Sequence, residues 1–432
     1  MSRVVVLDNG GGYIKAGCGG DANPSVVTPN CMYKPLSSKK FLHPSSAPDE
    51  DLTSAAIRRP IDRGYLINPE LQREIWSNLF SNHLRISPNS SSLLLTESFF
   101  SLPSVQRSTD ELVFEDFGFR SLYVTDSPRL VHLYEANHNP LSLASQSQCS
   151  LVVDCGFSFT HAAPVLQNFT LNYGVKRIDL GGKALTNYLK ELVSYRSLNV
   201  MDESFTMDDV KEKLCFVSRN VPRDLKVARI RGNDNTIRCT YVLPDGVTHT
   251  KGFVKNPSIA NRHLYQEDEP PSSKGSYKND DNRKQNVGEK HGIPTTTELA
   301  KTEFDLTNER FLVPEMIFHP ADLGMNQAGL AECIVRSVNT CHPLLQPLLY
   351  ESIILTGGST LFPRFAERLE MELRPLVPDE YNVKISKQNE PMLGAWRGGS
   401  LLAANPDFEA MCVTKAEYEE HGSARCRRRF FH

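Results

Sequence analysis

The most informative hydrophobic pattern lies at the start of the chain, where an apolar run leads into acidic, glycine and basic residues. The stretch from Val4 to Cys18 reads VVVLDNGGGYIKAGC. The apolar run predicts a buried strand, and the glycines predict a turn that allows close approach of a bound group. The run after them is short, rich in β-forming residues and broken by Gly17, so it predicts a returning strand. Asp8 and Lys15 would then flank exposed backbone N–H groups, which suits a phosphate and a hydrated cation.

Two other interpretations of this first motif are open when it is taken alone. A dinucleotide-binding turn requires the glycines to begin a helix, which the residues after them do not favour. An ordinary glycine hairpin without a ligand explains the motif equally well. A second copy of the pattern favours the ligand-binding interpretation. Residues 150–160, SLVVDCGFSFT, repeat it with Asp154 and Gly156 after a second apolar run. Two such hairpins predict two duplicated α/β halves that face each other.

A third apolar run, Ser352 to Leu355, ends in the sequence TGGST at residues 356–360. The apolar residues Phe365, Leu369 and Leu373 follow with helical spacing. Glycines at this junction allow a flat group to lie against the backbone. Two phosphate hairpins and one glycine shelf together predict a nucleotide cleft between two lobes.

Three further helices follow from periodicity and capping. Asn68 as N-cap and Pro69 in the first turn predict an amphipathic helix that continues to Leu84, with its apolar stripe facing the core. Residues 179–193 and 207–217 predict two more helices, the second with acidic residues in its first turn.

These motifs together resemble actin. Their order and spacing match from Val4 to the C-terminus, with one large insertion. The segments that carry the resemblance are DNGGGYIKAG, LLLTE at 93–97, VVDCGFSFTH, IDLGGKALTNYL at 178–189, VKEKLCF at 210–216, LPDG at 243–246, RFLVPE at 310–315 and ILTGGSTLFP at 354–363.

The resemblance implies an α/β, actin-like fold of two duplicated, ribonuclease H-like lobes around a nucleotide cleft. We expect the first lobe at residues 1–148, with a small subdomain around 30–70, and the second at 149–432. Residues 255–303 are polar and poor in aliphatic residues, which predicts a disordered insertion that binds a partner. Its available anchors are Tyr265, Tyr277 and Ile293.

Within the actin family, the chain is most similar to one class of nuclear actin-related proteins, and most closely to its plant members. That resemblance implies a non-catalytic subunit of an SWR-type chromatin remodelling complex, which exchanges a major-type nucleosomal histone for its Z-type variant and so regulates transcription. The partners would be the other subunits and, through the complex, histones or the nucleosome. The localisation would be nuclear, with a cytoplasmic pool left open.

The resemblance also implies a ligand, ATP or ADP with Mg²⁺, whether structural or lost. Asp8 would hold the metal through water, the first hairpin and Lys15 would meet phosphates, and Lys211 and Glu212 would lie near the adenine and ribose. On residue type alone, the lysine and the glutamate indicate a solvated helix face. The implied ligand-binding residues are Asp8, Asn9, Gly10, Gly11, Gly12, Lys15, Asp154, Gly156, Gly182, Lys211, Glu212, Gly357, Gly358 and Ser359.

Departures from actin argue against hydrolysis, so no catalytic residue is expected. Gly11 replaces a serine that touches the terminal phosphate, Phe157 replaces a carboxylate near the attacking water, and Ser127 aligns with the glutamine that orients that water. Met392 corresponds to a lysine that stacks on adenine, whereas His161 is retained. The alternatives are an active, filament-forming ATPase and a small-molecule kinase, which would need a carboxylate base.

The amino-acid composition limits which classes of protein this chain can belong to. The 432 residues are 40% apolar with a net charge of −3, which suits sizeable cores and gives no overall basic field for DNA. Ten cysteines without a C-x-x-C pair predict free thiols. With no signal sequence and no long apolar stretch, we expect a soluble intracellular protein without a membrane span.

Two charged segments bear on assembly. Residues 37–51, SSKKFLHPSSAPDED, stand where actin has a subunit-contacting loop, and their charge and prolines predict that the chain forms no homopolymer. The arginine cluster at 425–429 predicts a solvated tail, with a phosphate-binding patch or a nuclear-import patch as the alternatives.

Overall fold

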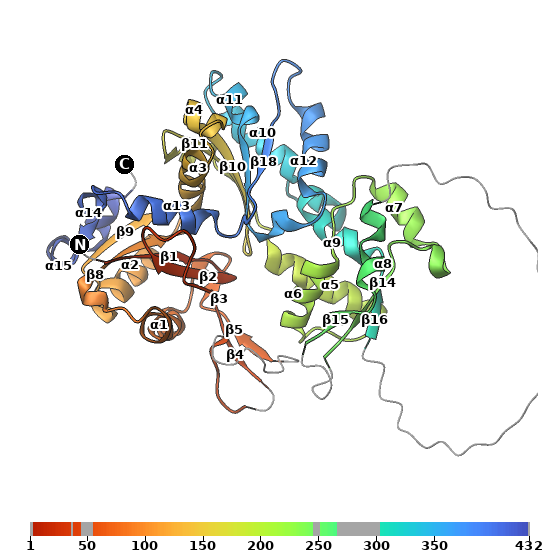
Figure 1. The fold of residues 1–432 in the computed structure, drawn as a ribbon, viewed down its shortest axis with the longest axis horizontal. Coiled ribbons are helices and arrows are strands. Elements are labelled where there is room, and N and C mark those ends of the chain that lie inside the picture. Colours follow the sequence, from red (N-terminus) through yellow and green to blue (C-terminus); the bar gives the residue numbers. More distant parts are fainter. Residues whose placement is uncertain (1–2, 36–37, 45–54, 245–250, 266–302, 431–432) are drawn as a thin grey trace, which may run out of the picture.

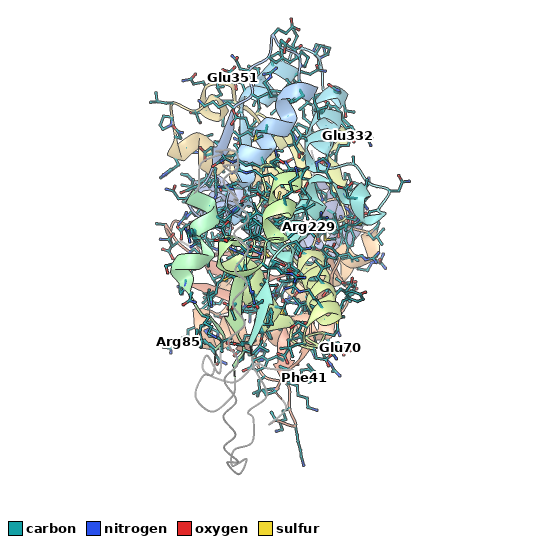
Figure 2. The ribbon with its side chains drawn as sticks, turned by 90° about the vertical axis from the view of Figure 1, so that its right-hand side faces the viewer. Phe41, Glu70, Arg85, Arg229, Glu332 and Glu351 are labelled. Atoms are coloured by element: carbon teal, nitrogen blue, oxygen red, sulfur yellow. The ribbon has the colours of Figure 1, made fainter. Side chains whose placement is uncertain are left out.

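The computed structural model describes residues 3–35, 38–44, 55–244, 251–265 and 303–430 (Figure 1). Two six-stranded sheets form the centres of two lobes. Figure 2 places Phe41 of the small subdomain near one end of the molecule and Glu351 of the second lobe at the other.

The first lobe is built on the sheet β19-β9-β8-β1-β2-β3. The first two strands form an antiparallel hairpin, and β1, β8 and β9 run parallel. Val5, Val6 and Leu7 of β1 are fully buried, as the apolar run predicts. The strands are β1 Arg3–Asn9, β2 Tyr13–Cys18, β3 Val26–Pro29, β8 Ser91–Thr96, β9 Ser121–Thr125 and β19 Val413–Thr414.

The second lobe repeats this plan in the sheet β12-β11-β10-β17-β18, with β13 on β11. Strands β10 and β11 form an antiparallel hairpin, and β10, β17 and β18 run parallel. This duplication confirms the two-lobed α/β fold expected from the sequence. The strands are β10 Cys149–Cys155, β11 Thr160–Leu166, β12 Phe169–Thr170, β13 Lys176–Ile178, β17 Ile353–Thr356 and β18 Ile385–Lys387.

Helices cover the faces of both sheets. In the first lobe, Asn68 caps α1 through its side chain, and Trp76 and Phe80 are buried as predicted. The main helices there are α1 Pro69–Asn78, continued by a π-helical segment Leu79–Leu84, α2 Pro103–Glu111 and α3 Ser127–His138. The second lobe carries α4 Leu143–Ser147, α5 Gly182–Arg196, α6 Ser204–Leu214, α7 Val221–Ala228, α9 Glu309–Phe318, α10 Leu330–Thr340, α11 Gln346–Glu351 and α12 Phe365–Leu373.

The small subdomain extends from the first lobe toward the second. It contains the ribbons β4 Met32–Lys34 with β5 Ala56–Arg58, and β6 Ile61–Asp62 with β7 Tyr65–Leu66. Asp62 Oδ1 lies 2.6 Å from Lys183 Nζ, and Arg177 Nη1 donates to the Tyr65 hydroxyl at 2.9 Å. Polar contacts therefore join this subdomain directly to the second lobe.

The C-terminal segment corrects the expected lobe boundary. After β18 the chain returns to the first lobe, where β19 pairs with β9 and Trp396 donates to the Val6 carbonyl at 3.1 Å (Figure 1). Assigning all of 149–432 to the second lobe is therefore wrong, because the first lobe's core is completed by this segment. Its helices are α13 Gly394–Ala403, α14 Phe408–Met411, α15 Lys415–His421 and α16 Ser423–Cys426.

The start of the predicted insertion is also ordered, which corrects the expectation of a disordered segment from 255 onward. A three-stranded sheet joins β14 Cys239–Val242, β15 Phe253–Val254 and β16 Glu303–Leu306, and α8 Pro257–Ala260 follows β15. The buried Arg310 donates to the Ala260 carbonyl at 2.6 Å. The Ala260 carbonyl and the apolar side chains of Ala260 and Leu264, which pack into the core, thus tie this stretch to the body. Tyr277 and Ile293 lie outside the described residues.

The C-terminal arginines are not all solvated, contrary to the predicted tail. Arg427 is 4% exposed. Its guanidinium donates to Asp110 Oδ1 at 2.5 Å and to Glu97 Oε2 at 2.7 Å. Arg428 is exposed. A buried ion-pair network therefore fixes the segment around Arg427 to the first lobe.

Replacing Arg427 by Ala should destabilise the protein by about 3–5 kcal/mol, because it leaves the buried Asp110 and Glu97 without their cation. Arg428→Ala is the matched control and should change the free energy of unfolding by less than about 0.5 kcal/mol. Both values come from denaturant unfolding. Equal stability of the two variants would contradict the structural role of Arg427.

Candidate functional site

The two hairpins face one cavity of about 370 Å³ between the lobes. In the first hairpin Asp8 pairs in register with Lys15, and in the second Asp154 pairs with His161. The structure brings every residue of the expected ligand-binding set to the wall of this cavity: Asp8, Asn9, Gly10, Gly11, Gly12, Lys15, Asp154, Gly156, Gly182, Lys211, Glu212, Gly357, Gly358 and Ser359.

The carboxylate of Asp8 is fixed by two partners. Lys15 Nζ lies 2.8 Å from its Oδ2, and the Thr96 hydroxyl donates to Oδ1 at 2.7 Å. Thr96 also accepts from the Asn9 backbone N–H at 3.1 Å. Thr96 closes the LLLT run of β8, and its part in the site becomes visible only when β8 is placed beside β1.

A buried amide network holds the turn of the first hairpin. The Asn30 side chain donates to the Gly10 carbonyl at 2.9 Å, and Asn9 donates to Gln72 Oε1 at 3.2 Å. Asn30 and Gln72 are fully buried. Sequence reasoning missed both residues, because each stands alone in a segment distant from the glycine turn.

Asp154 lies in an environment that disfavours its charge. Burial, reinforced by the nearby Asp8 carboxylate, raises its pKa to about 6, although Lys15 and the Ser127 hydroxyl act in the opposite direction. The Ser127 Oγ to Asp154 Oδ2 distance is 3.4 Å. Two carboxylates facing one cavity provide the ligand chemistry that a hydrated divalent cation requires.

His161 is buried and held between aromatic rings. The rings of Phe99 and Phe159 contact its imidazole edge-to-face, with centroids 5.3 and 5.4 Å away. Burial lowers its pKa to about 4. The imidazole is therefore neutral at physiological pH.

Lys211 is buried, so the solvated-face interpretation is wrong for this residue. Its ammonium donates to the Gly182 carbonyl at 3.1 Å and to the Thr186 hydroxyl at 2.7 Å, and it pairs with Asp208 at 2.8 Å. Burial raises the pKa of the neighbouring Glu212. Lys211 thus ties α6 to the start of α5 at the cavity wall.

The glycine shelf after β17 depends on its lack of side chains. Gly357 has φ +88°, and a Cβ there would lie 2.4 Å from the Cys155 carbonyl oxygen. Gly358 faces Met392, and Phe362 also lines the cavity. The shelf therefore offers flat backbone beside apolar side chains, which suits a planar ring.

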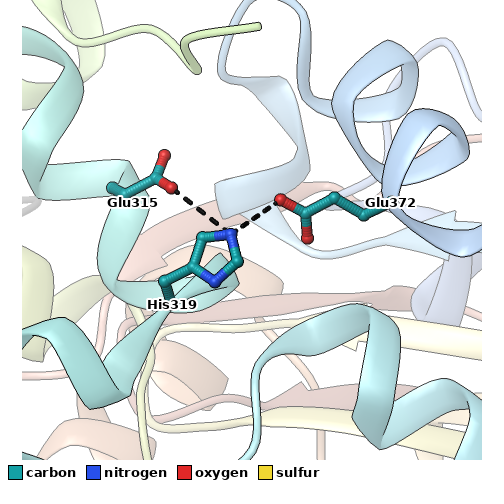
Figure 3. Close-up of side chains that lie close together, drawn as sticks. All are labelled: Glu315, His319 and Glu372. Carbon is teal, nitrogen blue, oxygen red and sulfur yellow. Dashed lines mark hydrogen bonds and ion pairs between the residues drawn. The ribbon is translucent and has the colours of Figure 1, made fainter. Parts of the chain in front are cut away.

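Among the described residues, Glu315, His319 and Glu372 converge closely enough to be considered as a metal site (Figure 3). His319 Nε2 lies 3.0 Å from Glu372 Oε1 and 3.7 Å from Glu315 Oε1. Arg368 reaches the same two oxygens at 2.6 and 2.7 Å. Because its guanidinium already satisfies both carboxylates, this cluster is an ion-pair network between α9 and α12.

The main cavity fits a nucleotide with a divalent cation. Its volume lies in the usual range for ligand sites, and its wall combines Lys15, glycine backbone and the carboxylates of Asp8 and Asp154. The ten cysteines are free thiols, as predicted. Within the described ranges, no helix is long and apolar enough to span a membrane.

Comparison with known proteins agrees with this fold. The family model described as Actin matches residues 1–431, and the chain belongs to the actin family. It is 68% identical to Actin-related protein 6 of Arabidopsis thaliana, with all of both chains covered. It is 64% identical to Actin-related protein 6 of Oryza sativa subsp. indica, over the whole chain and 99% of the relative.

More distant relatives carry the same name. Actin-related protein 6 of Dictyostelium discoideum is 38% identical over the whole chain and 94% of that protein. The protein of that name from Drosophila melanogaster is 34% identical, with 98% of each chain covered. These matches confirm the resemblance to one class of actin-related proteins, including its plant members.

Replacing Asp154 by Asn should stabilise the ligand-free protein at neutral pH. The folded-state pKa of about 6 exceeds the ordinary 3.8. The protonated carboxyl therefore contributes fully to the stability of the fold at low pH, and this contribution is lost as pH rises through 6. The free energy of unfolding of the variant should equal that of wild type at about pH 4 and exceed it by up to about 3 kcal/mol at about pH 7.

The measurement is the melting temperature of ligand-free wild type and variant across this pH range. Asp21→Asn, at an exposed position, is the control and should follow the wild-type profile. A variant that is less stable than wild type at neutral pH would contradict this account of Asp154.

Proposed function

We propose that this protein is a non-catalytic, nuclear subunit of an SWR-type remodelling complex that exchanges a major-type nucleosomal histone for its Z-type variant. The observation that carries the proposal is the full-length, 68% identity to Actin-related protein 6 of Arabidopsis thaliana. The altered second hairpin supports a role in assembly rather than in catalysis. The partners are the other subunits and, through them, histones or the nucleosome.

The cavity binds ATP or ADP with Mg²⁺ as a structural ligand in this proposal. The nucleotide would supply phosphate groups and a cation that engage both lobes. Lys15 and the first-hairpin backbone would hold phosphate, and Asp8 would orient the water around the metal. The Gly357–Gly358 shelf would carry the planar base. Each of these groups is already positioned by contacts within the protein.

The same site lacks support for hydrolysis. Phe157 offers no oxygen to a cation or an attacking water, and Ser127 provides one short hydroxyl that contacts Asp154. His161 is neutral and enclosed by aromatic rings. With its pKa of about 4, His161 is a weak base toward water at neutral pH. This site is accordingly proposed to bind without turnover.

Lys15→Ala should abolish the stabilisation of the protein by ADP or ATP, because it removes the ammonium that pairs with Asp8 at the first hairpin. A ligand at a hundred times its dissociation constant stabilises by about 2.7 kcal/mol, which a thermal-shift assay detects. Lys213→Ala is the control, since this lysine pairs with Asp209 at the exposed side of α6. Wild type that shows no shift and carries no nucleotide would contradict nucleotide binding.

The same preparations should release no phosphate above background, and Phe157→Asp should not restore turnover. The runner-up function, an actin-like ATPase that forms filaments, predicts the opposite. Phosphate release at the rate of filamentous actin, or polymers that sediment in magnesium and salt, would support it and contradict the non-catalytic proposal.

Deleting residues 266–302 should leave the body stable but weaken its entry into the remodelling complex. This stretch lies outside the described residues, and its polar composition suits a partner-binding segment. With a bridge of about ten glycine and serine residues, the melting temperature should stay within a few degrees of wild type. Co-purification with tagged complex subunits measures the second effect.

The matched controls use the same segment and its ordered flank. Scrambling only the charged residues of 266–302 should reduce co-purification less than the deletion. Extending the deletion back to 255 should destabilise the body, because it removes the Ala260 carbonyl that accepts from Arg310 and His263, which contacts Asp224. Normal co-purification of the 266–302 deletion would place the partner surface on the actin-like body.

A further inference from the structure

The two hairpins touch each other across the cavity. A Cβ added to Gly12 would lie 2.8–2.9 Å from Cβ, Cγ and Cδ2 of Phe157, and one added to Gly11 would lie 2.6 Å from the Ser158 hydroxyl oxygen. Real Cβ atoms essentially never approach so closely. The side chains of the second hairpin therefore occupy the space that side chains of the first hairpin would otherwise fill.

The ring of Phe157 is enclosed from other sides as well. The guanidinium of Arg59 lies over it, 4.6 Å from the ring centroid. On the second-lobe side, a Cβ at Gly182 would lie 3.6 Å from Phe157 Cα and 3.7 Å from Cδ2. Arg59 also donates weakly to the Gly11 and Gly12 carbonyls, at 3.4 Å each. Displacing this ring would require its neighbours to move.

The charges at this end of the cavity suit a smaller anion. Lys15 and Lys211 are the lysines of the cavity wall, and each is already paired with an aspartate. The Asp8 and Asp154 carboxylates face the same space. A further phosphate group would add negative charge beside these carboxylates, and both lysines of the wall are already paired.

We propose that the cavity selects a nucleoside diphosphate over the corresponding triphosphate, because Phe157 and Ser158 fill the space between the two phosphate hairpins. This inference rests on the proposed nucleotide binding and specifies its ligand. A third phosphate must displace a packed ring, which reduces affinity about ten- to hundredfold. Phe157 would thus determine which nucleotide binds, in addition to standing where actin has a carboxylate near the metal.

The test is titration calorimetry of the nucleotide-free full chain with Mg-ADP and Mg-ATP. We expect wild type to bind ADP at least about tenfold more tightly than ATP. Phe157→Ala should bring the two affinities within about threefold of each other, mainly through tighter ATP binding, since it removes the obstructing ring. Phe157→Leu, which keeps an apolar side chain, should fall between them and covers the case in which the alanine variant does not fold.

Phe169→Ala is the matched control. Phe169 also lies under an arginine, with the Arg129 guanidinium 5.2 Å from its centroid, but it is half exposed and away from the cavity. This variant should keep the wild-type ratio of affinities.

The possible outcomes test the ADP selectivity and the proposed nucleotide binding separately. Equal binding of ADP and ATP by wild type would overturn the selectivity and leave nucleotide binding intact. A selectivity that survives both Phe157 substitutions would overturn the role of the ring. No binding of either nucleotide by wild type would overturn the proposed nucleotide site itself.

Discussion

The close approach of two glycine hairpins constrains the rest of this structure. Each hairpin follows a buried strand, and the two sheets place the turns opposite each other. Gly11 and Gly12 have no side chains, so Ser158 and Phe157 can lie against their backbone. Larger residues at either glycine would force the lobes apart or displace the ring. This contact joins the lobes beside the cavity, together with the ion pair between Asp62 and Lys183.

Local sequence signals predicted the parts of the site that lie on one continuous segment. The apolar run before Asp8 and the glycines after it specify a strand and a turn, so the hairpin and the pairing of Asp8 with Lys15 follow from a few neighbouring residues. The repeat at Asp154 predicted the duplication for the same reason. Asn68 likewise marked the start of α1 through capping.

The residues that sequence reasoning missed support the site from distant segments. Asn30, Gln72 and Thr96 are single polar residues with no periodic partner, and Arg59 belongs to a short connection between ribbons. Their roles arise only when the sheet brings strand ends together and leaves buried carbonyls and carboxylates to be satisfied. A single sequence contains no signal of that pairing, although the resemblance to actin located the cavity that they surround.

Composition gave a wrong expectation for the start of the insertion and for the C-terminal arginines, and the physical reason is the same for both. The insertion was expected to be disordered and the C-terminal arginines to be solvated. The Ala260 carbonyl at the start of the insertion nevertheless accepts from the buried Arg310, and Arg427 is itself buried against Asp110. Arg310 fastens the ordered start of the insertion through a carbonyl, and Arg427 fastens the end of the chain through Asp110. Charge counts cannot distinguish a solvated arginine from one that completes a buried network, because the difference lies in the partner.

The electrostatics of the cavity explain why the proposed loss of hydrolysis is compatible with the proposed nucleotide binding. Asp8 and Asp154 face each other across the cleft, and burial with mutual repulsion raises the pKa of Asp154 to about 6. A divalent cation would relieve this repulsion whether or not any bond is cleaved, so the free energy of binding depends on carboxylates that the chain has kept. Hydrolysis depends instead on groups that orient and deprotonate water, and Phe157, which lines the cavity, offers no donor or acceptor for this purpose. The two functions can therefore be lost separately.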